Sequence, residues 1–367
     1  MRRTLILTLA LCLLACPLWA AGYRAAIGTG ADQITVVVVS GTPYQMGFSY
    51  GKLMSAEVKA TMGRFLQGVQ AADPVRCTNA NLDQAWATVA PSVSARFVEE
   101  MKGLAAGSGV SFDNLRRAHC TSLVSDYSCS GVAVWGPASA NGHLYQIRNL
   151  DWSTDLGLQD HPVITVYYPD QGIAHANIGF AGYIGSMAGM NAEGIALTEK
   201  GATPAADYPF QLQGVPFFVL FRDLLYDASS LDQARAMITR AQRHKKYYYV
   251  VGDGDLPGAF KVRAFAPGLD IWGANDRTDE VAPKVMPNAV YVTMNNDRAW
   301  AHLQANYGKY DAARMIELSR LVGTDGALTY VVYDATAREF WVAYAEGAQP
   351  AHKQQYVHFR LQDYRRP

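Results

Sequence analysis

Residues 128–135 read Ser-Cys-Ser-Gly-Val-Ala-Val-Trp, and residues 147–152 read Ile-Arg-Asn-Leu-Asp-Trp beyond an Asn-Gly turn at 141–142. Two short apolar runs joined by such a turn predict a β-hairpin. In this hairpin a cysteine begins one strand, and an arginine and an aspartate end the other. We therefore expect the three side chains to meet at one end of a sheet, in an arrangement typical of an activated thiol.

The composition is that of a folded globular protein. Of the 367 residues, 50% are hydrophobic and 17% are charged, so the chain can bury a large core. The formal net charge is zero, and no basic stripe is interleaved with aromatic residues. The sequence thus lacks the features typical of nucleic-acid binding. Because no Cys or His pair has metal-ligand spacing, we expect neither a nucleic-acid partner nor a metal or cofactor.

The first 20 residues have the pattern of a secretory signal peptide. Two arginines precede an apolar run at 5–14, and residues 18–20 form an acceptable cleavage site. The run is too short to span a bilayer, and no later segment offers about 20 uninterrupted apolar residues. We expect a mature protein, without a membrane span, that is periplasmic or secreted. Lipid attachment at Cys16 is the alternative, since residues 13–16 resemble a lipoprotein processing site.

Three cysteines remain after removal of residues 1–20: Cys77, Cys120 and Cys129. In an oxidising compartment an odd number leaves one thiol unpaired. We expect a disulfide between Cys77 and Cys120, because both lie in the helical N-terminal part and Cys129 belongs to the candidate site. Two reduced core cysteines are the alternative.

The pattern of the chain changes near residue 128. Before it, apolar residues mostly follow helical spacing; after it, short β-type runs are separated by Gly, Asn and Pro signals. Neighbouring runs predict antiparallel hairpins, and central helices between two batches of hairpins predict a layered α+β domain. The expected strands are 34–40, 130–135, 143–148, 162–168, 173–180, 194–199, 247–251, 259–265, 289–293, 328–333 and 339–344, and the expected helices are 46–62, 82–106, 216–227, one beginning at 231, and 310–322.

The candidate thiol needs a cation and a base, because only the thiolate attacks. Arg148 offers the cation, whereas His143, the nearest histidine in sequence, lies at the other end of the predicted strand. If the bond between Ser128 and Cys129 is cut, the freed α-amino group, with a pKa near 8, can accept the thiol proton. An ordinary surface ion pair of Arg148 with Asp151, and an inert buried Cys129, are the alternatives.

Residues 129–152, from Cys-Ser-Gly-Val to Arg-Asn-Leu-Asp-Trp, closely resemble a known nucleophile region. It is that of the acyl-coenzyme A:6-aminopenicillanic acid acyltransferase-like branch of the N-terminal nucleophile (Ntn) hydrolases, which are related to choloylglycine hydrolases, penicillin V acylases and acid ceramidase. Supporting similarities lie at 47–51, 100–107, 189–197 and 222–225.

The resemblance implies a four-layer αββα sandwich, in which two antiparallel sheets are covered by helices. It also implies a precursor that cuts itself between Ser128 and Cys129. The products would be a mostly helical α chain, 21–128, and a β chain, 129–367, which together form one compact domain. The oligomeric state is left open.

The same resemblance assigns roles to site residues. Arg148 has the position of the family's arginine, which supports the thiolate, and Asp151 that of the aspartate, which orients the new amino terminus. The family's oxyanion asparagine follows a strand, and here Asn295 is preferred over Asn296. This segment departs from the common Thr-Asn-His pattern, so two loop-capping asparagines are the alternative. Residues 198–201, Thr-Glu-Lys-Gly, depart as well, because many relatives have an asparagine there; the substrate polarity is expected to differ.

Three rival interpretations are weaker. Residues 47–51, Gly-Phe-Ser-Tyr-Gly, fit the G-x-S-x-G pattern of α/β-hydrolases, but residues 42–45 separate them from the preceding strand. A papain-like protease needs its cysteine early in a helix, whereas Cys129 opens a β-type run. The non-enzymatic alternative is a secreted binding protein on an unprocessed Ntn scaffold.

We expect hydrolysis of a linear amide bond through an acyl-thioester on Cys129, with a small-molecule or lipid-like N-acyl amide as the substrate. The aromatic segments 217–218 and 247–249 are candidates for an acyl pocket, with plain core as the alternative. Acyl transfer is the alternative reaction. Water is the preferred acceptor, because transfer from coenzyme A makes little sense outside the cytoplasm.

Overall fold

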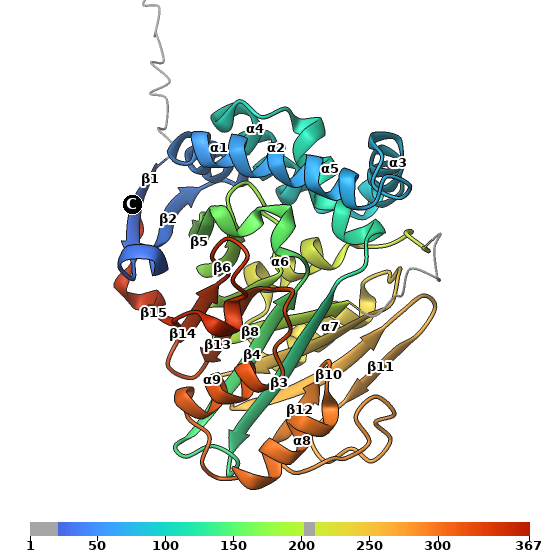
Figure 1. Cartoon of the computed structure of the whole chain (residues 1–367), viewed down its shortest axis with the longest axis vertical. Helices are drawn as coiled ribbons and strands as arrows, with labels where there is room; N and C mark the ends of the chain where they lie inside the picture. Colours follow the sequence, from blue (N-terminus) through green and yellow to red (C-terminus); the bar gives the residue numbers. More distant parts are fainter. Residues whose placement is uncertain (1–20, 202–209) are drawn as a thin grey trace, which may run out of the picture.

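The computed structural model describes residues 21–201 and 210–367. The predicted signal peptide and the lipid-attachment alternative at Cys16 lie outside the described residues. Figure 1 shows two β-sheets and a group of helices gathered at one end of the molecule. Within the described ranges, none of the helices is both long enough and apolar enough to cross a membrane.

The larger sheet contains nine strands in the described part of the chain, in the order β1-β2-β5-β6-β7-β8-β9-β10-β11. One neighbouring pair, β2 and β5, is parallel, so the prediction of purely antiparallel sheets is wrong here. The reason is the long connection between these two strands, which contains several helices and a hairpin of the other sheet and returns the chain to the same end of this sheet. The strands are β1 (Ala21–Ile27), β2 (Ile34–Gly41), β5 (Pro162–Pro169), β6 (His175–Phe180), β7 (Ala188–Asn191), β8 (Ile195–Gly201), β9 (Tyr247–Asp253), β10 (Gly258–Ala264) and β11 (Leu269–Trp272).

The smaller sheet is antiparallel throughout, as predicted, with the order β12-β3-β4-β13-β14-β15 among the described residues. Every strand expected from the sequence is present, whereas β1, β7, β11 and β15 were not expected. None of the four has the long apolar run on which the prediction relied. Three of them are edge strands, which are less buried, and β7 has only four residues. The strands are β12 (Ala289–Val292), β3 (Ser128–Gly136), β4 (Gly142–Asp151), β13 (Ala327–Asp334), β14 (Glu339–Tyr344) and β15 (Val357–Arg360).

The helices follow the apolar spacing, with breaks that the spacing alone did not predict. The predicted helix at 46–62 is two helices that meet at Met54, and the predicted helix at 82–106 is interrupted at 90–94, where Pro91 cannot continue the helix. The helices are α1 (Pro43–Leu53), α2 (Ser55–Ala72), α3 (Asn79–Val89), α4 (Ala95–Ser108), α5 (Phe112–Val124), α6 (Phe217–Asp227), α7 (Leu231–Arg240), α8 (Asn296–Ala305), which was not predicted, and α9 (Ala312–Leu321).

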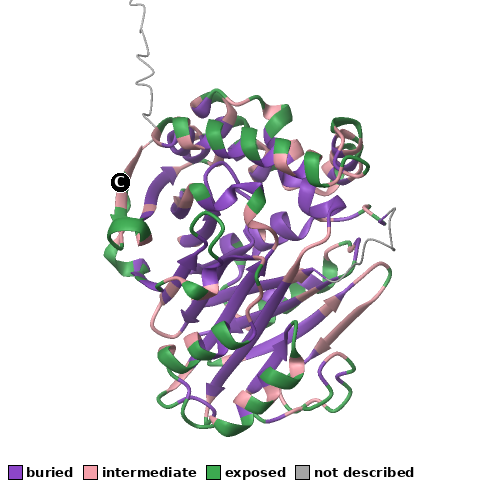
Figure 2. Cartoon of the chain, viewed as in Figure 1, coloured by how far each residue is buried: buried purple, intermediate pink, exposed green. Residues whose placement is uncertain are grey.

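The two sheets pack face to face, with β3 and β4 against β8 and β9. Helices α1, α6 and α7 pack on the larger sheet, and α8 and α9 pack on the smaller one. Figure 2 shows that the strands between these helices are mostly buried. The predicted four-layer αββα sandwich is therefore confirmed.

Close contacts fix the two sheets against each other beside the candidate site. A Cβ atom added to Gly131 of β3 would lie 2.7 Å from the Thr198 side chain of β8, so only glycine fits at this position. The buried amide of Gln146 donates to the Thr198 hydroxyl and to backbone oxygens of both β8 and β9. These bonds satisfy polar groups inside the sandwich and hold the register of one sheet over the other.

The Gly-x-Ser-x-Gly segment at 47–51 is a helix-packing element. Thr42 and Gln45 form a capping box that starts α1 directly before it. A Cβ atom on Gly47 would lie 2.0 Å from the Glu100 carbonyl oxygen of α4, so the helices touch through their backbones. Ser49 is buried within α1. The segment is therefore not a strand-to-helix elbow, which excludes the α/β-hydrolase interpretation.

A buried ion pair connects the region before residue 128 with the region after it. Arg222 of α6 donates to Glu100 of α4 at 2.6 Å, and each residue is 1% exposed. The guanidinium also lies 3.9 Å from the ring centroid of Tyr167. Because an unpaired charge at this depth would be very costly, the pair ties α4 to α6.

Candidate active site

The β3–β4 hairpin places the predicted nucleophile and arginine on one face of the smaller sheet. Cys129 lies opposite Leu150, and Gly131 lies opposite Arg148. Residues that face each other across two strands share a face, as do residues two apart along one strand. The side chains of Cys129 and Arg148 therefore point to the same side, between the two sheets.

Cys129 is fully buried, and burial raises the pKa of its thiol from 9.0 to about 12. The nearby charge of Arg148 acts in the opposite direction and favours the thiolate. Arg148 is itself buried and held by two backbone oxygens, since its Nε donates to Met187 and its Nη1 to Asn149. In the uncut chain the thiol is thus protonated at neutral pH, beside a fixed cation.

Asp151 lies at the same end of the hairpin, directly opposite Ser128. Its Oδ1 accepts a hydrogen bond of 2.6 Å from the Tyr330 hydroxyl. Its Oδ2 is buried and, among the described residues, has no hydrogen-bond partner. Burial raises the pKa of Asp151, and the side chains of Tyr330 and Thr324, which act as hydrogen-bond donors to the carboxylate, oppose this shift. Asp151 thus has one carboxylate oxygen without a hydrogen bond, on the residue that pairs with Ser128 in the hairpin.

Glu199 is a third charged side chain of the site, and its position was not predicted from the sequence. This buried side chain of β8 accepts a 2.8 Å hydrogen bond from the Tyr127 hydroxyl, and its Oε2 lies 3.5 Å from Nη2 of Arg148. Burial raises its pKa from 4.5 to about 7, and Arg148 acts against the shift. The sequence did contain a signal for this residue, since a carboxylate inside an otherwise apolar strand is unusual unless it has a partner.

The two candidate oxyanion asparagines differ in what holds them. Asn295 is exposed and caps α8, with its Oδ1 accepting from the backbone N–H of Arg298. Among the described residues its Nδ2 has no partner, so it is free to donate. Asn296 is committed at both ends of its amide: Oδ1 accepts from Thr293, and Nδ2 donates to Val281. Both side chains thus cap a loop; among the described residues Asn295 keeps both amide hydrogens unpaired, whereas Asn296 has donated one of its two.

The asparagine segment lies beside the nucleophile strand through the preceding residue. The backbone N–H of Met294 donates to the Ser130 hydroxyl at 3.1 Å, and its sulfur contacts the hydroxyl of Ser128. The loop that carries Asn295 therefore runs next to Cys129.

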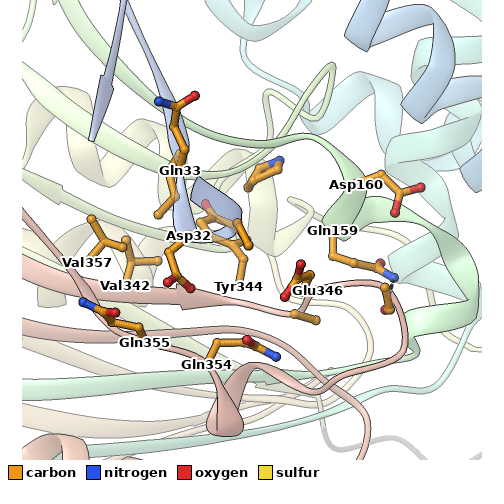
Figure 3. Close-up of a pocket in the computed structure, with 15 residues that line it drawn as sticks. Asp32, Gln33, Gln159, Asp160, Val342, Tyr344, Glu346, Gln354, Gln355 and Val357 are labelled. Carbon is orange, nitrogen blue, oxygen red and sulfur yellow. Dashed lines mark hydrogen bonds between the residues drawn. The ribbon is translucent and has the colours of Figure 1, made fainter. Parts of the chain in front are cut away.

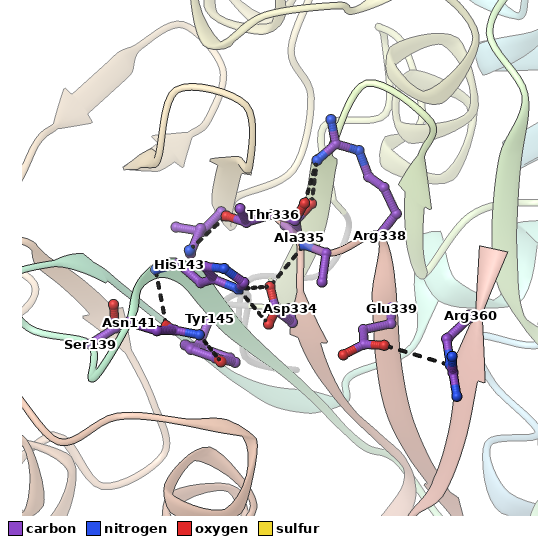
Figure 4. A network of polar contacts seen from close by, with 12 residues as sticks. Ser139, Asn141, His143, Tyr145, Asp334, Ala335, Thr336, Arg338, Glu339 and Arg360 are labelled. Atoms are coloured by element: carbon purple, nitrogen blue, oxygen red, sulfur yellow. Dashed lines mark hydrogen bonds and ion pairs between the residues drawn. The ribbon is translucent and has the colours of Figure 1, made fainter. Parts of the chain in front are cut away.

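His143 lies far from these groups along the same strand, as predicted. It sits at the start of β4, whereas Asp151 ends it. Its Nδ1 is 2.8 Å from a carboxylate oxygen of Asp334, and Figure 4 shows this pair within a separate polar network. His143 is therefore not the base for Cys129.

The predicted disulfide is not formed. Cys77 and Cys120 are free thiols, and both are fully buried among the apolar side chains of the helical region. Burial raises the pKa of Cys77 to about 11 and also raises the pKa of Cys120. The structure thus corresponds to two reduced core cysteines, packed as small apolar side chains.

A surface cavity of about 290 Å³ lies away from these residues. Figure 3 shows its lining between the β1–β2 turn and strands β14 and β15, including Asp32, Gln159, Tyr344, Glu346 and Gln354. Cys129, Arg148 and Asp151 are not part of it. In the described ranges, no cluster of three or more His, Cys, Asp or Glu side chains has a metal-binding arrangement.

Part of the chain is similar to a known protein family. Residues 138–260 match the model of the family described as acyl-coenzyme A:6-aminopenicillanic acid acyl-transferase. The predicted resemblance to this family is confirmed. The matched segment contains Arg148, Asp151 and Glu199 and begins nine residues after Cys129.

Similar proteins span much of the chain at low identity. Protein dcd1B of Dictyostelium discoideum is 23% identical over 384 residues, which cover 91% of this chain and 75% of the relative. The Caenorhabditis elegans ortholog of N-acylethanolamine-hydrolyzing acid amidase is 12% identical, with a TM-score of 0.45, and the match covers 62% of this chain and 99% of that one. Penicillin V acylase from Agrobacterium tumefaciens is 14% identical, with a TM-score of 0.39, and covers 59% and 83%.

Proposed function

We propose that the protein is an exported, self-processing cysteine amidohydrolase that cleaves linear N-acyl amides. The observation that carries this proposal is the buried Oδ2 of Asp151, which lacks a described partner and lies on the residue opposite Ser128. A new amino terminus on Cys129 would supply the donor that this acceptor lacks. Arg148, on the same face as Cys129, supplies the positive charge that favours a thiolate.

Self-processing begins with the thiol of Cys129. Its sulfur attacks the carbonyl carbon of Ser128, the C–S bond forms, the C–N bond breaks, and the nitrogen takes the thiol proton. Water then hydrolyses the resulting thioester, which yields the carboxylate of Ser128 and restores the thiol. The freed α-amino group of Cys129 then binds Asp151. Cys129 now carries both the nucleophile, its thiol, and the base, its α-amino group.

Hydrolysis of a substrate repeats this chemistry on an external amide. The α-amino group takes the proton of the Cys129 thiol, and the thiolate attacks the amide carbonyl. The developing oxyanion is held by Nδ2 of Asn295 and a backbone N–H, and the departing amine takes the proton from the α-ammonium group. Water then hydrolyses the acyl-thioester. Water is preferred over a second amine as acceptor, because an exported enzyme meets no coenzyme A thioester.

The test is intact mass measurement and N-terminal sequencing of the exported protein. We expect two chains, 21–128 and 129–367, from the natural sequence and a single uncut chain from Cys129→Ala. The matched control is Cys77→Ala, which removes another buried free thiol and should still be cut. Only the cut protein should release amine from a panel of N-acyl amides. Cutting that persists in Cys129→Ala would exclude the proposal.

A further inference from the structure

Tyr127, two residues before Cys129, lies in an aromatic box. Its ring centroid is 5.3 Å from that of Trp152 and 6.4 Å from that of Phe217. A Cβ atom on Gly201 would lie 3.3 Å from atoms of the ring, so this glycine makes room for it. The Nζ atom of Lys245 lies 6.0 Å from the ring centroid. Together these four residues enclose a flat ring.

The hydroxyl end of Tyr127 connects this box to the candidate nucleophile. It donates to Oε1 of Glu199 at 2.8 Å, and the other oxygen of Glu199 faces Arg148 at 3.5 Å. The charges of both Arg148 and Glu199 act on the Cys129 thiol. The box is therefore connected through Glu199 to Arg148, which shares a sheet face with Cys129, and its polar end is the buried side chain of Glu199.

The box and its occupant lie on opposite sides of the proposed cut. Tyr127 precedes the cut, whereas Trp152, Gly201 and Phe217 follow it in the chain, as do Glu199 and Lys245. Cutting after Ser128 makes Tyr127 the penultimate residue of a free chain end, and chain ends fray readily. Departure of the ring would leave the enclosing residues in place, with one oxygen of Glu199 lacking its donor.

We propose that the Tyr127 box is a substrate subsite, which takes an aromatic group that bears a hydroxyl and is occupied by Tyr127 until the chain is cut. This inference rests on the proposed function, because it places the substrate amide at Cys129. The Tyr127 ring shows that the box fits a flat aromatic group. Its hydrogen bond to Glu199 shows that the box can also bind a hydroxyl on that group. A site that binds a hydroxyl in this way rejects ligands that lack it.

The experiment uses the uncut Cys129→Ala chain, which neither cuts itself nor hydrolyses a substrate. Three amides are titrated by calorimetry: 4-hydroxyphenylacetamide, phenylacetamide without the hydroxyl, and butyramide without the ring. We expect no binding to Cys129→Ala, because Tyr127 fills the box. The double variant with Tyr127→Ala should bind 4-hydroxyphenylacetamide, at least about ten-fold more tightly than phenylacetamide, and should not bind butyramide.

Tyr127→Phe in the same background is the matched control, because it keeps the ring and should keep the box closed to all three amides. At a pH above 7, where Glu199 is ionised, adding Glu199→Gln to the Tyr127→Ala variant should reduce the preference for the hydroxyl, since a neutral acceptor replaces a charged one. The proposal is overturned if Tyr127→Ala gains no affinity for 4-hydroxyphenylacetamide, or if it binds the three amides equally.

A second measurement does not depend on the folding of the Tyr127→Ala variant. The cut natural protein should be inhibited by 4-hydroxyphenylacetamide at about ten-fold lower concentration than by phenylacetamide, and butyramide should have no effect. Equal inhibition by all three would overturn the subsite. Failure of self-cutting in the natural chain would instead contradict the proposed function, and the calorimetry on Cys129→Ala would still report on the box.

Discussion

Asp151 lies directly opposite Ser128 in the β3–β4 hairpin, and its buried Oδ2 has no hydrogen-bond partner among the described residues. Leaving an acceptor buried and unpaired costs about 1–3 kcal/mol. In the proposed reaction this acceptor gains a donor when the chain is cut, because the amino group of Cys129 forms beside it. Under this proposal, cutting the chain removes the cost of the unpaired oxygen.

Asp151→Asn should slow self-cutting and amide hydrolysis by about 100-fold, because a neutral amide stabilises the new ammonium group less than a carboxylate does. The rates are measured by gel densitometry of the two chains and by amine release. Asp334→Asn is the matched control, since Asp334 is also buried but pairs with His143 at the far end of β4. An equal loss in both variants would indicate general destabilisation, and an unchanged rate in Asp151→Asn would refute its role.

The thiol content distinguishes the structure from the sequence-based disulfide. Protein lacking residues 1–20, unfolded in urea without reductant, should yield three free thiols: Cys77, Cys120 and Cys129. In the folded, uncut chain none should react quickly with iodoacetamide at pH 8, because all three are buried and their pKa values are raised. Cutting should expose Cys129 alone to the reagent. A count of one thiol in urea would restore the Cys77–Cys120 disulfide.

Glu199 should make stability depend on pH. Its pKa is about 7 when folded, against an ordinary value of 4.5, so the folded state binds the proton more tightly. The resulting stabilisation is complete below pH 4.5 and is lost as the pH rises through 7, a change of about 3 kcal/mol. Urea unfolding is compared for Cys129→Ala with and without Glu199→Gln, which stays neutral. Their difference in unfolding free energy should fall between pH 4.5 and 7.

The control for this pH effect is Glu99→Gln in the same Cys129→Ala background. Glu99 forms an exposed ion pair with Lys102 on α4. Removing its charge should change the unfolding free energy by less than about 1 kcal/mol at every pH in this range. If the Glu199 difference is as flat as this one, Glu199 is not held in its protonated form.

Two helical glycines should respond oppositely to alanine. Gly47→Ala brings a Cβ atom to 2.0 Å from the Glu100 carbonyl oxygen, so α1 and α4 must separate, at a cost of about 3 kcal/mol. Gly63→Ala meets no atom within 4 Å on the exposed side of α2, and should stabilise by about 0.5–1 kcal/mol. Thermal unfolding of Cys129→Ala chains measures both. Stabilisation by Gly47→Ala would show that the helices do not touch there.

Local sequence predicted the hairpin well, since apolar runs and a turn determine both the strands and their pairing. That register puts Cys129 and Arg148 on one face of the smaller sheet, and it puts Asp151 at the same end of the hairpin. The predicted Cys77–Cys120 disulfide was wrong, because an odd number of cysteines does not show which two sulfur atoms are close enough to bond. The prediction of antiparallel pairing was wrong for β2 and β5, because the residue pattern of a strand does not show which distant strand it will pair with.

By itself, the sequence determined the layered α+β class and the position of the candidate nucleophile, because both depend on side chains that are close along the chain. Only the tertiary structure decided that Glu199 faces Arg148 and that Tyr127 fills a box beside them. These contacts join residues 51 and 72 positions apart. They form when the two sheets pack against each other. The periodicity of apolar residues predicts the strands, but it does not predict which residues of one sheet contact which residues of the other.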